Sequence, residues 1–172
     1  IILAFAILSI YFYSIKIVNV GLGELFVAIK SAMIVIGAFY VQTGLIDMAA
    51  LYIGIIVGTL SASVLFVNSF PDYDADRDNG RRTLVIILGK KRGAKLLPLL
   101  VSVSYGLIAI GILLGYTKLY SLISFISIPA AVSAIRQLKE NSEKVEKLVP
   151  AMTTTLLFSR ITGILLAISL LL

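Results

Sequence analysis

The sequence contains no cysteine and no histidine, and it carries few charges for its length. These absences exclude a disulfide framework, a zinc site of the usual kind and a Cys/His nucleophile pair. The protein ligands left for a metal are oxygens, which suit Mg²⁺, Mn²⁺ or Ca²⁺. Charged residues make up 14% of the 172 residues, against about 25% in a typical soluble domain. The composition therefore argues against a soluble fold.

Long apolar runs take the place of the missing charges. Hydrophobic residues make up 59% of the chain, and the mean hydropathy is +1.05. A helix needs about 20 apolar residues to cross a bilayer. Runs near this length cover residues 1–15, 24–44, 47–71, 93–115, 119–138 and 149–172. The sequence therefore predicts an all-α fold, a polytopic bundle of about six transmembrane segments.

The chain begins with Ile1 inside an apolar run, so we expect the first segment to be truncated. We treat residues 1–172 as a single transmembrane domain of a longer protein. Two prolines give local expectations. Pro129 should kink the fifth segment, and Pro150 should open the sixth, where the N–H that proline lacks has no helical partner.

Basic residues are unevenly shared between the two sides of the predicted bundle. If the segments cross in alternate directions, one side receives twelve of the fifteen Lys and Arg residues and the other receives Lys118. Lys30 and Arg160 lie within segments. The positive-inside rule makes the basic side cytoplasmic. Topology and anionic lipid then explain most of the net charge of +6, and no nucleic-acid partner is needed.

An acidic cluster follows the third segment, in the stretch "NSFPDYDADRDNGRRTL" (residues 68–84). A helix that starts at Asp47 and rises 1.5 Å per residue crosses the hydrocarbon by about residue 67. Asn68, Asp72 and Asp76 are spaced by four, so on a helix they share one face just beyond the cytoplasmic boundary. Gly80, four residues further, is the expected end of that helix.

The spacing and the residue types point to a diphosphate site. Two carboxylates one helical turn apart repel each other, and a divalent cation offsets that repulsion. Carboxylates together with a substrate phosphate are the usual environment of Mg²⁺. Arg81 and Arg82 follow with guanidinium groups that suit bidentate phosphate binding. We therefore interpret Asp72 and Asp76 as metal ligands and catalytic residues of a site for a Mg²⁺-bound diphosphate.

Four other interpretations of the acidic cluster compete with a diphosphate site. An acidic, solvated helix end is the simplest. A calcium loop fails on spacing, because counting from Asp74 puts the glycine at position seven instead of six and Val85 at position twelve instead of Glu. A cation-coupled transporter should place acids at mid-membrane and show inverted repeats, and neither is visible. A scaffold with an acidic partner-binding loop should show no Mg²⁺-dependent diphosphate binding.

The pattern N-x-x-x-D-x-x-x-D-x-x-x-G-[KR]-[KR]-T-L, followed by an apolar stretch and Leu-Gly, resembles the second aspartate-rich motif of the UbiA superfamily of intramembrane prenyltransferases. The stretch "GLGELFVAIKSAMIVIGAFYVQTG" (residues 21–44) is most similar to the MenA-type branch. The resemblance covers residues 16–92 at the level of motifs. Its members here are Asn68, Asp72, Asp76, Gly80, Arg81, Arg82, Thr83, Leu84 and the run "VIILG" ending at Gly89.

The resemblance implies a fold of nine transmembrane helices and an active site that faces the cytoplasm. It implies Mg²⁺-dependent transfer of an isoprenyl group from its diphosphate to an aromatic or lipophilic acceptor within the membrane, as in quinone biosynthesis. A glycerol-phosphate lipid or a porphyrin-type acceptor stays open. The implied metal ligands are Asp72 and Asp76. The implied diphosphate-binding residues are Asn68, Arg81, Arg82, Lys16 and Tyr13, the last two from "YFYSIK".

The sequence also departs from the family pattern. The branch usually has a basic residue just before the first aspartate, and this chain has Pro71. The first aspartate-rich motif is absent, and the only other acidic group, Glu140, Glu143 and Glu146, lies on a lysine-rich loop. We expect the missing part to be three N-terminal helices. The 172-residue piece alone is therefore not expected to turn over.

Overall fold

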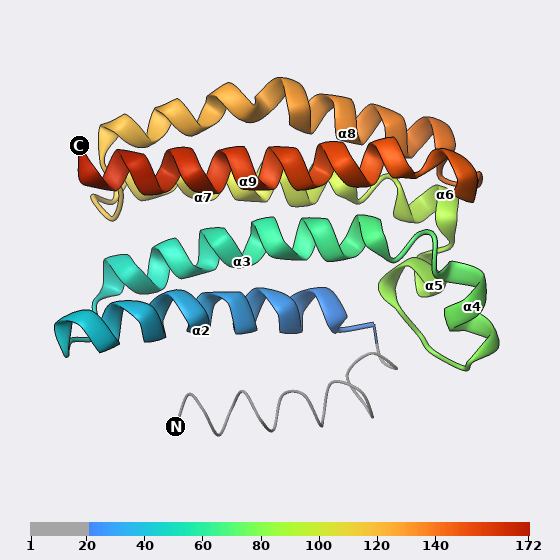
Figure 1. Cartoon of the computed structure of the whole chain (residues 1–172), viewed down its shortest axis with the longest axis horizontal. Coiled ribbons are helices and arrows are strands. Elements are labelled where there is room, and N and C mark those ends of the chain that lie inside the picture. The colour runs from blue at the N-terminus through green and yellow to red at the C-terminus, as the bar shows by residue number, and fades with distance from the viewer. Residues whose placement is uncertain (1–20) are drawn as a thin grey trace.

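The computed structural model describes residues 21–172, which form helices joined by short connections (Figure 1). No strand occurs within these residues, so the all-α prediction is confirmed. The elements are α2 (Gly23–Thr43), α3 (Met48–Asn68), α4 (Tyr73–Asp78), α5 (Leu84–Leu88), α6 (Lys90–Gly93), α7 (Leu97–Leu113), the 3₁₀ helix η3 (Leu119–Ser127), α8 (Ile128–Asn141), the 3₁₀ turn η4 (Val145–Lys147) and α9 (Val149–Leu171).

Five stretches of the described residues are long and apolar enough to cross a membrane. They are Gly23–Thr43, Met48–Asn68, Lys90–Leu113, Leu119–Asn141 and Val145–Leu171. These spans match five of the six predicted segments. The first predicted segment, residues 1–15, lies outside the described residues. The protein is therefore an integral membrane protein with a polytopic helical fold.

Local signals in the sequence set most of the helix ends. The carboxylate of Asp47 caps α3 by accepting a hydrogen bond from the N–H of Ala49 at 3.3 Å. Pro150 lies in the first turn of α9, as predicted. Pro129 lies in the first turn of α8, directly after η3. It therefore marks a change from 3₁₀ to α-helix in the fifth segment, where we had predicted a kink.

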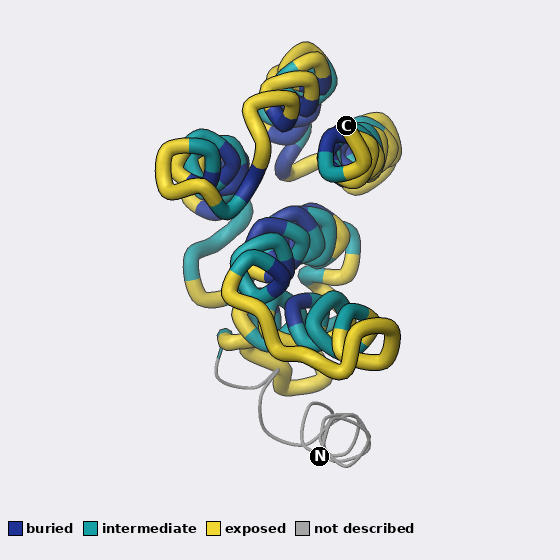
Figure 2. Tube along the Cα trace, turned by 90° about the vertical axis from the view of Figure 1, so that its left-hand side faces the viewer, coloured by how far each residue is buried: buried dark blue, intermediate teal, exposed yellow. Residues whose placement is uncertain are grey.

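The helix α3 lies at the centre of the bundle. It packs against α2 on one side and against α7 and α9 on the other, while α8 packs against α9. The view along the bundle shows α3 between α2 and the helices α7 and α9, with many residues of α3 coloured as buried (Figure 2). The acidic segment leaves the end of α3, so the best-enclosed helix of the described bundle carries the candidate site.

Close backbone contact joins α2 to α3 through two glycines of a G-x-x-x-G pattern, Gly54 and Gly58. A Cβ atom added to Gly58 would lie 2.5 Å from the carbonyl oxygen of Ala28, and one added to Gly54 would lie 2.9 Å from that of Ala32. Apolar side chains gain little from leaving lipid for a helix interface. Van der Waals contact between closely spaced backbones therefore holds these two helices together.

Hydroxyl groups join the other helices. Ser104 of α7 donates to Thr59 of α3 at 3.0 Å, and the hydroxyls of Ser127 and Thr162 lie 2.7 Å apart between η3 and α9. The buried polar residues of the described chain are mostly serines and threonines, whereas many large apolar side chains face outward. A small, hydroxyl-rich interior and an apolar exterior are what a helix bundle in lipid requires.

Alanine substitutions at two glycines distinguish the effect of backbone contact on stability from the effect of helix propensity. We expect Gly58→Ala to destabilise the protein by about 1–3 kcal/mol, because the new methyl group meets the backbone of α2. The matched variant Gly106→Ala has no atom within 4 Å of the new methyl, so it should be neutral or stabilising by up to about 1 kcal/mol. Thermal unfolding of the full-length protein in detergent, followed by circular dichroism, measures both. Equal effects of the two substitutions would contradict this packing.

Candidate functional site

The candidate site lies at one end of the bundle, where α4, α5 and α6 sit close to the connection between α8 and α9 (Figure 1). Within residues 21–172, the basic residues assigned to one side of the membrane cluster on these elements and on the adjoining helix ends and turns. Lys118, the residue assigned to the other side, follows α7 at the opposite end. The alternation of crossings used to sort the charges therefore holds within residues 21–172.

The chain does not continue from α3 into the acidic segment as one helix. The helix α3 ends at Asn68, and α4 begins at Tyr73. The N–H groups of Phe70 and Tyr73 donate to carbonyl groups three residues earlier, at 3.2 and 3.3 Å, and Pro71 has no N–H to give. The prediction of one helical face shared by Asn68 and the aspartates is therefore wrong. Asn68 lies exposed at the end of α3.

The two aspartates of the predicted site nevertheless lie one helical turn apart. The N–H of Asp76 donates to the carbonyl oxygen of Asp72 at 2.7 Å, which is the spacing of an α-helix. Asp76 has a side chain that is only 14% exposed, and its carboxylate accepts a hydrogen bond from Arg81 at 3.0 Å. Asp72 is exposed, and none of the described basic side chains lies within ion-pair distance of it.

A Schellman motif at Gly80 turns the chain back toward Asp76. Gly80 has a φ of +73°, which a residue with a Cβ adopts only at a cost. The N–H of Gly80 donates to the carbonyl oxygen of Arg77 at 3.0 Å, and that of Arg81 donates to that of Asp76 at 2.9 Å. The predicted end of the helix at Gly80 is thus confirmed. The turn also brings the Arg81 side chain to the carboxylate.

The two predicted phosphate-binding arginines differ in whether a carboxylate already pairs with them. The guanidinium of Arg81 is engaged by Asp76. Arg82 is exposed, and within the described part of the chain no carboxylate pairs with it. Arg82 is therefore the arginine available to a ligand without breaking an existing pair. Tyr13 and Lys16 lie outside the described residues.

The donor set at Asp72 and Asp76 fits Mg²⁺ with a phosphate ligand. No group of three or more His, Cys, Asp or Glu side chains converges within residues 21–172, so the described residues form no closed cage of the kind that calcium prefers. Two carboxylates one turn apart match a Mg²⁺ ion that keeps waters and takes its other ligands from a substrate phosphate.

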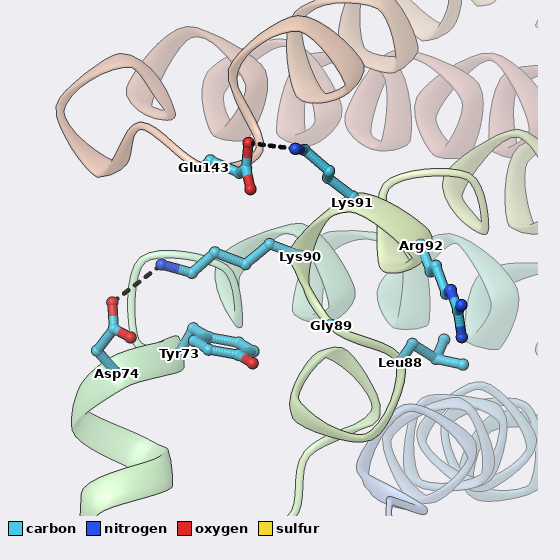
Figure 3. A pocket seen from close by; sticks show the side chains of 8 residues that line it. All are labelled: Tyr73, Asp74, Leu88, Gly89, Lys90, Lys91, Arg92 and Glu143. Atoms are coloured by element: carbon cyan, nitrogen blue, oxygen red, sulfur yellow. Dashed lines mark hydrogen bonds and ion pairs between the residues drawn. The ribbon is translucent and has the colours of Figure 1, made fainter.

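An open cavity of about 530 Å³ lies between α4, α6 and the turn after α8 (Figure 3). Two ion pairs form between residues that line it. Lys90 Nζ lies 2.9 Å from Asp74 Oδ2, and Lys91 Nζ lies 3.2 Å from Glu143 Oε2. Neither Asp72 nor Asp76 lines the cavity. The lining residues are Tyr73, Asp74, Leu88, Gly89, Lys90, Lys91, Arg92 and Glu143.

No pattern in the sequence predicts these ion pairs. From the sequence, Lys90 adds to the positive charge of one side of the membrane, and Asp74 either orients an arginine or has no specific role. The two residues are 16 positions apart, so no helical spacing links them. The one usable signal was the basic run "GKKRG" (residues 89–93) directly after the motif.

Two phenylalanines near the end of α3 and two cations within the predicted segments take no part in these ion pairs. Phe66 and Phe70 are fully buried, with ring centroids 5.4 Å apart in an edge-to-face contact. Both are packing residues of the buried core. Lys30 is exposed on α2, and Arg160 is exposed on α9 without a carboxylate partner among the described residues.

Comparison with known proteins places the chain in a family. The UbiA prenyltransferase family matches residues 1–170. The chain is 30% identical to a 1,4-dihydroxy-2-naphthoate octaprenyltransferase of Bacillus subtilis, over 87% of this chain and 48% of the relative. It is 30% identical to a 2-carboxy-1,4-naphthoquinone phytyltransferase of Synechocystis, over 74% of this chain and 42% of the relative. It is 28% identical to a 1,4-dihydroxy-2-naphthoate octaprenyltransferase of Escherichia coli, over 86% of this chain and 50% of the relative.

The chain spans about half the length of these curated relatives. No solved structure matches it significantly. The family match covers nearly the whole chain, including the paired aspartates at the end of α3 and the Gly-Arg-Arg-Thr turn that follows them. The chain therefore belongs to the UbiA prenyltransferase family.

Proposed function

We propose that the full-length protein is a prenyltransferase that moves an isoprenyl group from its diphosphate to an aromatic acceptor inside the membrane. The observation that carries this proposal is the Asp72–Asp76 pair, which lies one helical turn apart just beyond the end of a membrane-spanning helix in a UbiA-family chain. The excess of basic residues on the same side supports a cytoplasmic position for the pair. Residues 1–172 form one domain with the N-terminal part of the protein.

Each residue of the segment has a distinct role in this proposal. Asp72 is exposed and is the more open carboxylate of the pair to a metal-bound diphosphate. Asp76 completes the pair, and Arg81 fixes the orientation of its carboxylate. Arg82 donates to phosphate oxygens as the leaving group gains charge. Asn68 lies exposed at the end of α3 and offers an amide donor at the same boundary.

The chemistry requires stabilisation of the leaving group and exclusion of water. Mg²⁺, when bound by Asp72 and Asp76, would neutralise part of the negative charge on the diphosphate. The five spans of the described chain provide an apolar setting in which the isoprenyl chain lies among helices. Water is scarce in such a setting, which protects the allylic carbon from hydrolysis before the acceptor attacks.

The names of the relatives indicate the acceptor class. Two of them are named for transfer to 1,4-dihydroxy-2-naphthoate and one for transfer to 2-carboxy-1,4-naphthoquinone. We therefore propose a bicyclic, quinone-type acceptor with a carboxyl group, and a role in quinone biosynthesis. A glycerol-phosphate lipid and a porphyrin-type ring are the alternatives within the superfamily.

Neutralising the aspartates one at a time tests the carboxylate pair. We expect Asp72→Asn and Asp76→Asn to lower prenyl transfer by about 10²-fold or more, the usual loss when a group that stabilises developing charge is removed. Both variants should also lose Mg²⁺-dependent binding of an isoprenyl thiodiphosphate, measured by calorimetry on the full-length protein. Asp78→Asn is the matched control, since its side chain is 75% exposed on the same short helix. Retention of Mg²⁺-dependent binding in both site variants would refute the proposed site. Ion flux through the protein without consumption of diphosphate would indicate a transporter instead.

The two arginines should respond differently to substitution. We expect Arg82→Met to raise KM for the prenyl donor about tenfold, because one charged hydrogen bond to phosphate is lost. Arg81→Met should lower kcat as well, because Asp76 loses its partner. Combining Arg81→Met with Asp76→Asn should cost no more than Asp76→Asn alone, as expected for residues that act as a unit. Steady-state kinetics at varied donor concentration measure these effects, with Lys95→Met as the charge control. Additive effects at Arg81 and Asp76 would contradict their coupling.

A panel of acceptors tests the substrate class. Labelled prenyl diphosphates of several lengths are supplied with dihydroxynaphthoate, hydroxybenzoate, glycerol 1-phosphate and a porphyrin-type ring. We expect labelled product with dihydroxynaphthoate, because the relatives of this chain are named for such acceptors. Product with another acceptor alone would keep the prenyltransferase and replace the quinone-type acceptor.

A further inference from the structure

The short helix α4, which follows Asp72 and includes Asp76, is not stable on its own. The helix α4 has six residues, and none of them is buried. An isolated helix of this length is unstable in water. The Pro71 region before it interrupts the helical hydrogen bonding that would have continued from α3. Contacts with other elements must therefore set the rotation of α4, and with it the direction of Asp72 and Asp76.

One side of α4 is attached to α6 through Lys90. Lys90 Nζ lies 2.9 Å from Asp74 Oδ2 and 4.8 Å from the centre of the Tyr73 ring. Figure 3 shows the Lys90 side chain reaching across the cavity, above the Tyr73 ring, to the Asp74 carboxylate. The Lys90 side chain is only 14% exposed, so water screens these contacts less than those of an exposed pair. The ammonium group thus binds two neighbouring side chains of α4 at once.

The backbone that follows Lys90 is packed against buried residues. Gly93 and Ala94, which follow it, are buried. A Cβ added to Gly93 would lie 3.4 Å from the Phe70 ring, and Phe70 is fully buried. The backbone at Lys90 is therefore fixed against the end of α3 and continues into α7. Lys90 connects a short exposed helix to the packed part of the bundle.

We propose that Lys90 and Asp74 form a clasp that positions the Asp72–Asp76 pair for the diphosphate. Asp74 lies between the two site residues in the sequence, so holding its side chain fixes the rotation of α4 and leaves Asp72 and Asp76 turned away from the clasp. Both residues act through α4 and are positioning residues. This inference rests on the proposed function, because it assigns the pair a diphosphate to meet.

Neighbouring ion pairs do not have the same role. Lys91 and Glu143 are 77% and 57% exposed, and they connect α6 to the turn after α8 without touching α4. Arg77 lies 3.8 Å from Asp74 and 5.7 Å from the centre of the Tyr73 ring. Arg77 is on α4 itself, so it cannot tie that helix to the bundle. Lys90 is therefore the cation whose loss should free α4.

Binding and rescue form the first test of the clasp in the full-length protein. We expect Lys90→Met and Asp74→Asn to weaken Mg²⁺-dependent binding of an isoprenyl thiodiphosphate about tenfold, because small displacements of positioned groups are costly. The exchange Asp74→Lys with Lys90→Glu should restore most of that binding. The control Lys91→Met removes an equal charge from α6 and should bind like the wild type. Equal losses in Lys91→Met and Lys90→Met, or no rescue by the exchange, would overturn the clasp.

A distance measurement supplies a readout that is independent of ligand binding. This chain has no cysteine, so spin labels can be placed at Ala75→Cys on α4 and Lys139→Cys on α8, with any other cysteine of the full-length protein replaced. Double electron–electron resonance should give a narrow distance distribution for the wild type and Lys91→Met. It should give a broad one for Lys90→Met and a narrow one again for the exchange. An unchanged distribution in Lys90→Met would overturn the inference.

The variant Asp72→Asn separates the two proposals. It should keep the narrow distribution while losing Mg²⁺-dependent binding. If Asp72→Asn and Asp76→Asn both bind normally, the proposed function fails whatever the distances show. If they lose binding and Lys90→Met keeps both binding and a narrow distribution, the function stands and the clasp is wrong.

Discussion

The thickness of the lipid hydrocarbon, set against the length of α3, determines where the site can lie. The 21 residues from Met48 to Asn68 rise about 32 Å, close to the ~30 Å of apolar thickness in a bilayer. Asp47 caps one end, and the polar segment starts directly after the other. Charged groups beyond Asn68 therefore lie at the boundary, where a diphosphate can stay in water while its hydrocarbon chain enters the membrane.

The same lipid environment decides how the bundle is held together. Apolar side chains gain little by leaving lipid, so helices associate through close backbones and polar groups. Gly58 lets α2 approach the backbone of α3, and Thr59, one position further, accepts a hydrogen bond from Ser104 of α7. Neighbouring residues of α3 thus serve two different helices. Because α3 is fixed on several sides, its end gives the site a rigid starting point.

Local signals made much of this arrangement predictable from the sequence. The apolar runs, the start of α3 at Asp47 and the stop at Gly80 depend on local residues, and the sequence predicts each of them. The break at Pro71 was missed because the four-residue spacing of Asn68, Asp72 and Asp76 was read as one helix. The contact of Lys90 with Asp74 was missed because it depends on how α5 and the turn at Gly89, with a φ of +78°, fold the chain back. Such long-range contacts leave no periodic pattern.

The charges around α4 give a physical reason for a cation at one particular carboxylate. Four aspartates lie within residues 72–78, and their mutual repulsion must be offset. Within the described residues, Asp76 is paired with Arg81, Asp74 with Lys90, and Asp78 lies 3.7 Å from Arg77. Three cations thus meet three of the four carboxylates. Asp72, which directly precedes α4, is left with an unpaired charge near Asp76, whose side chain is only 14% exposed. The electrostatics therefore favour an added cation at Asp72 over the other three aspartates.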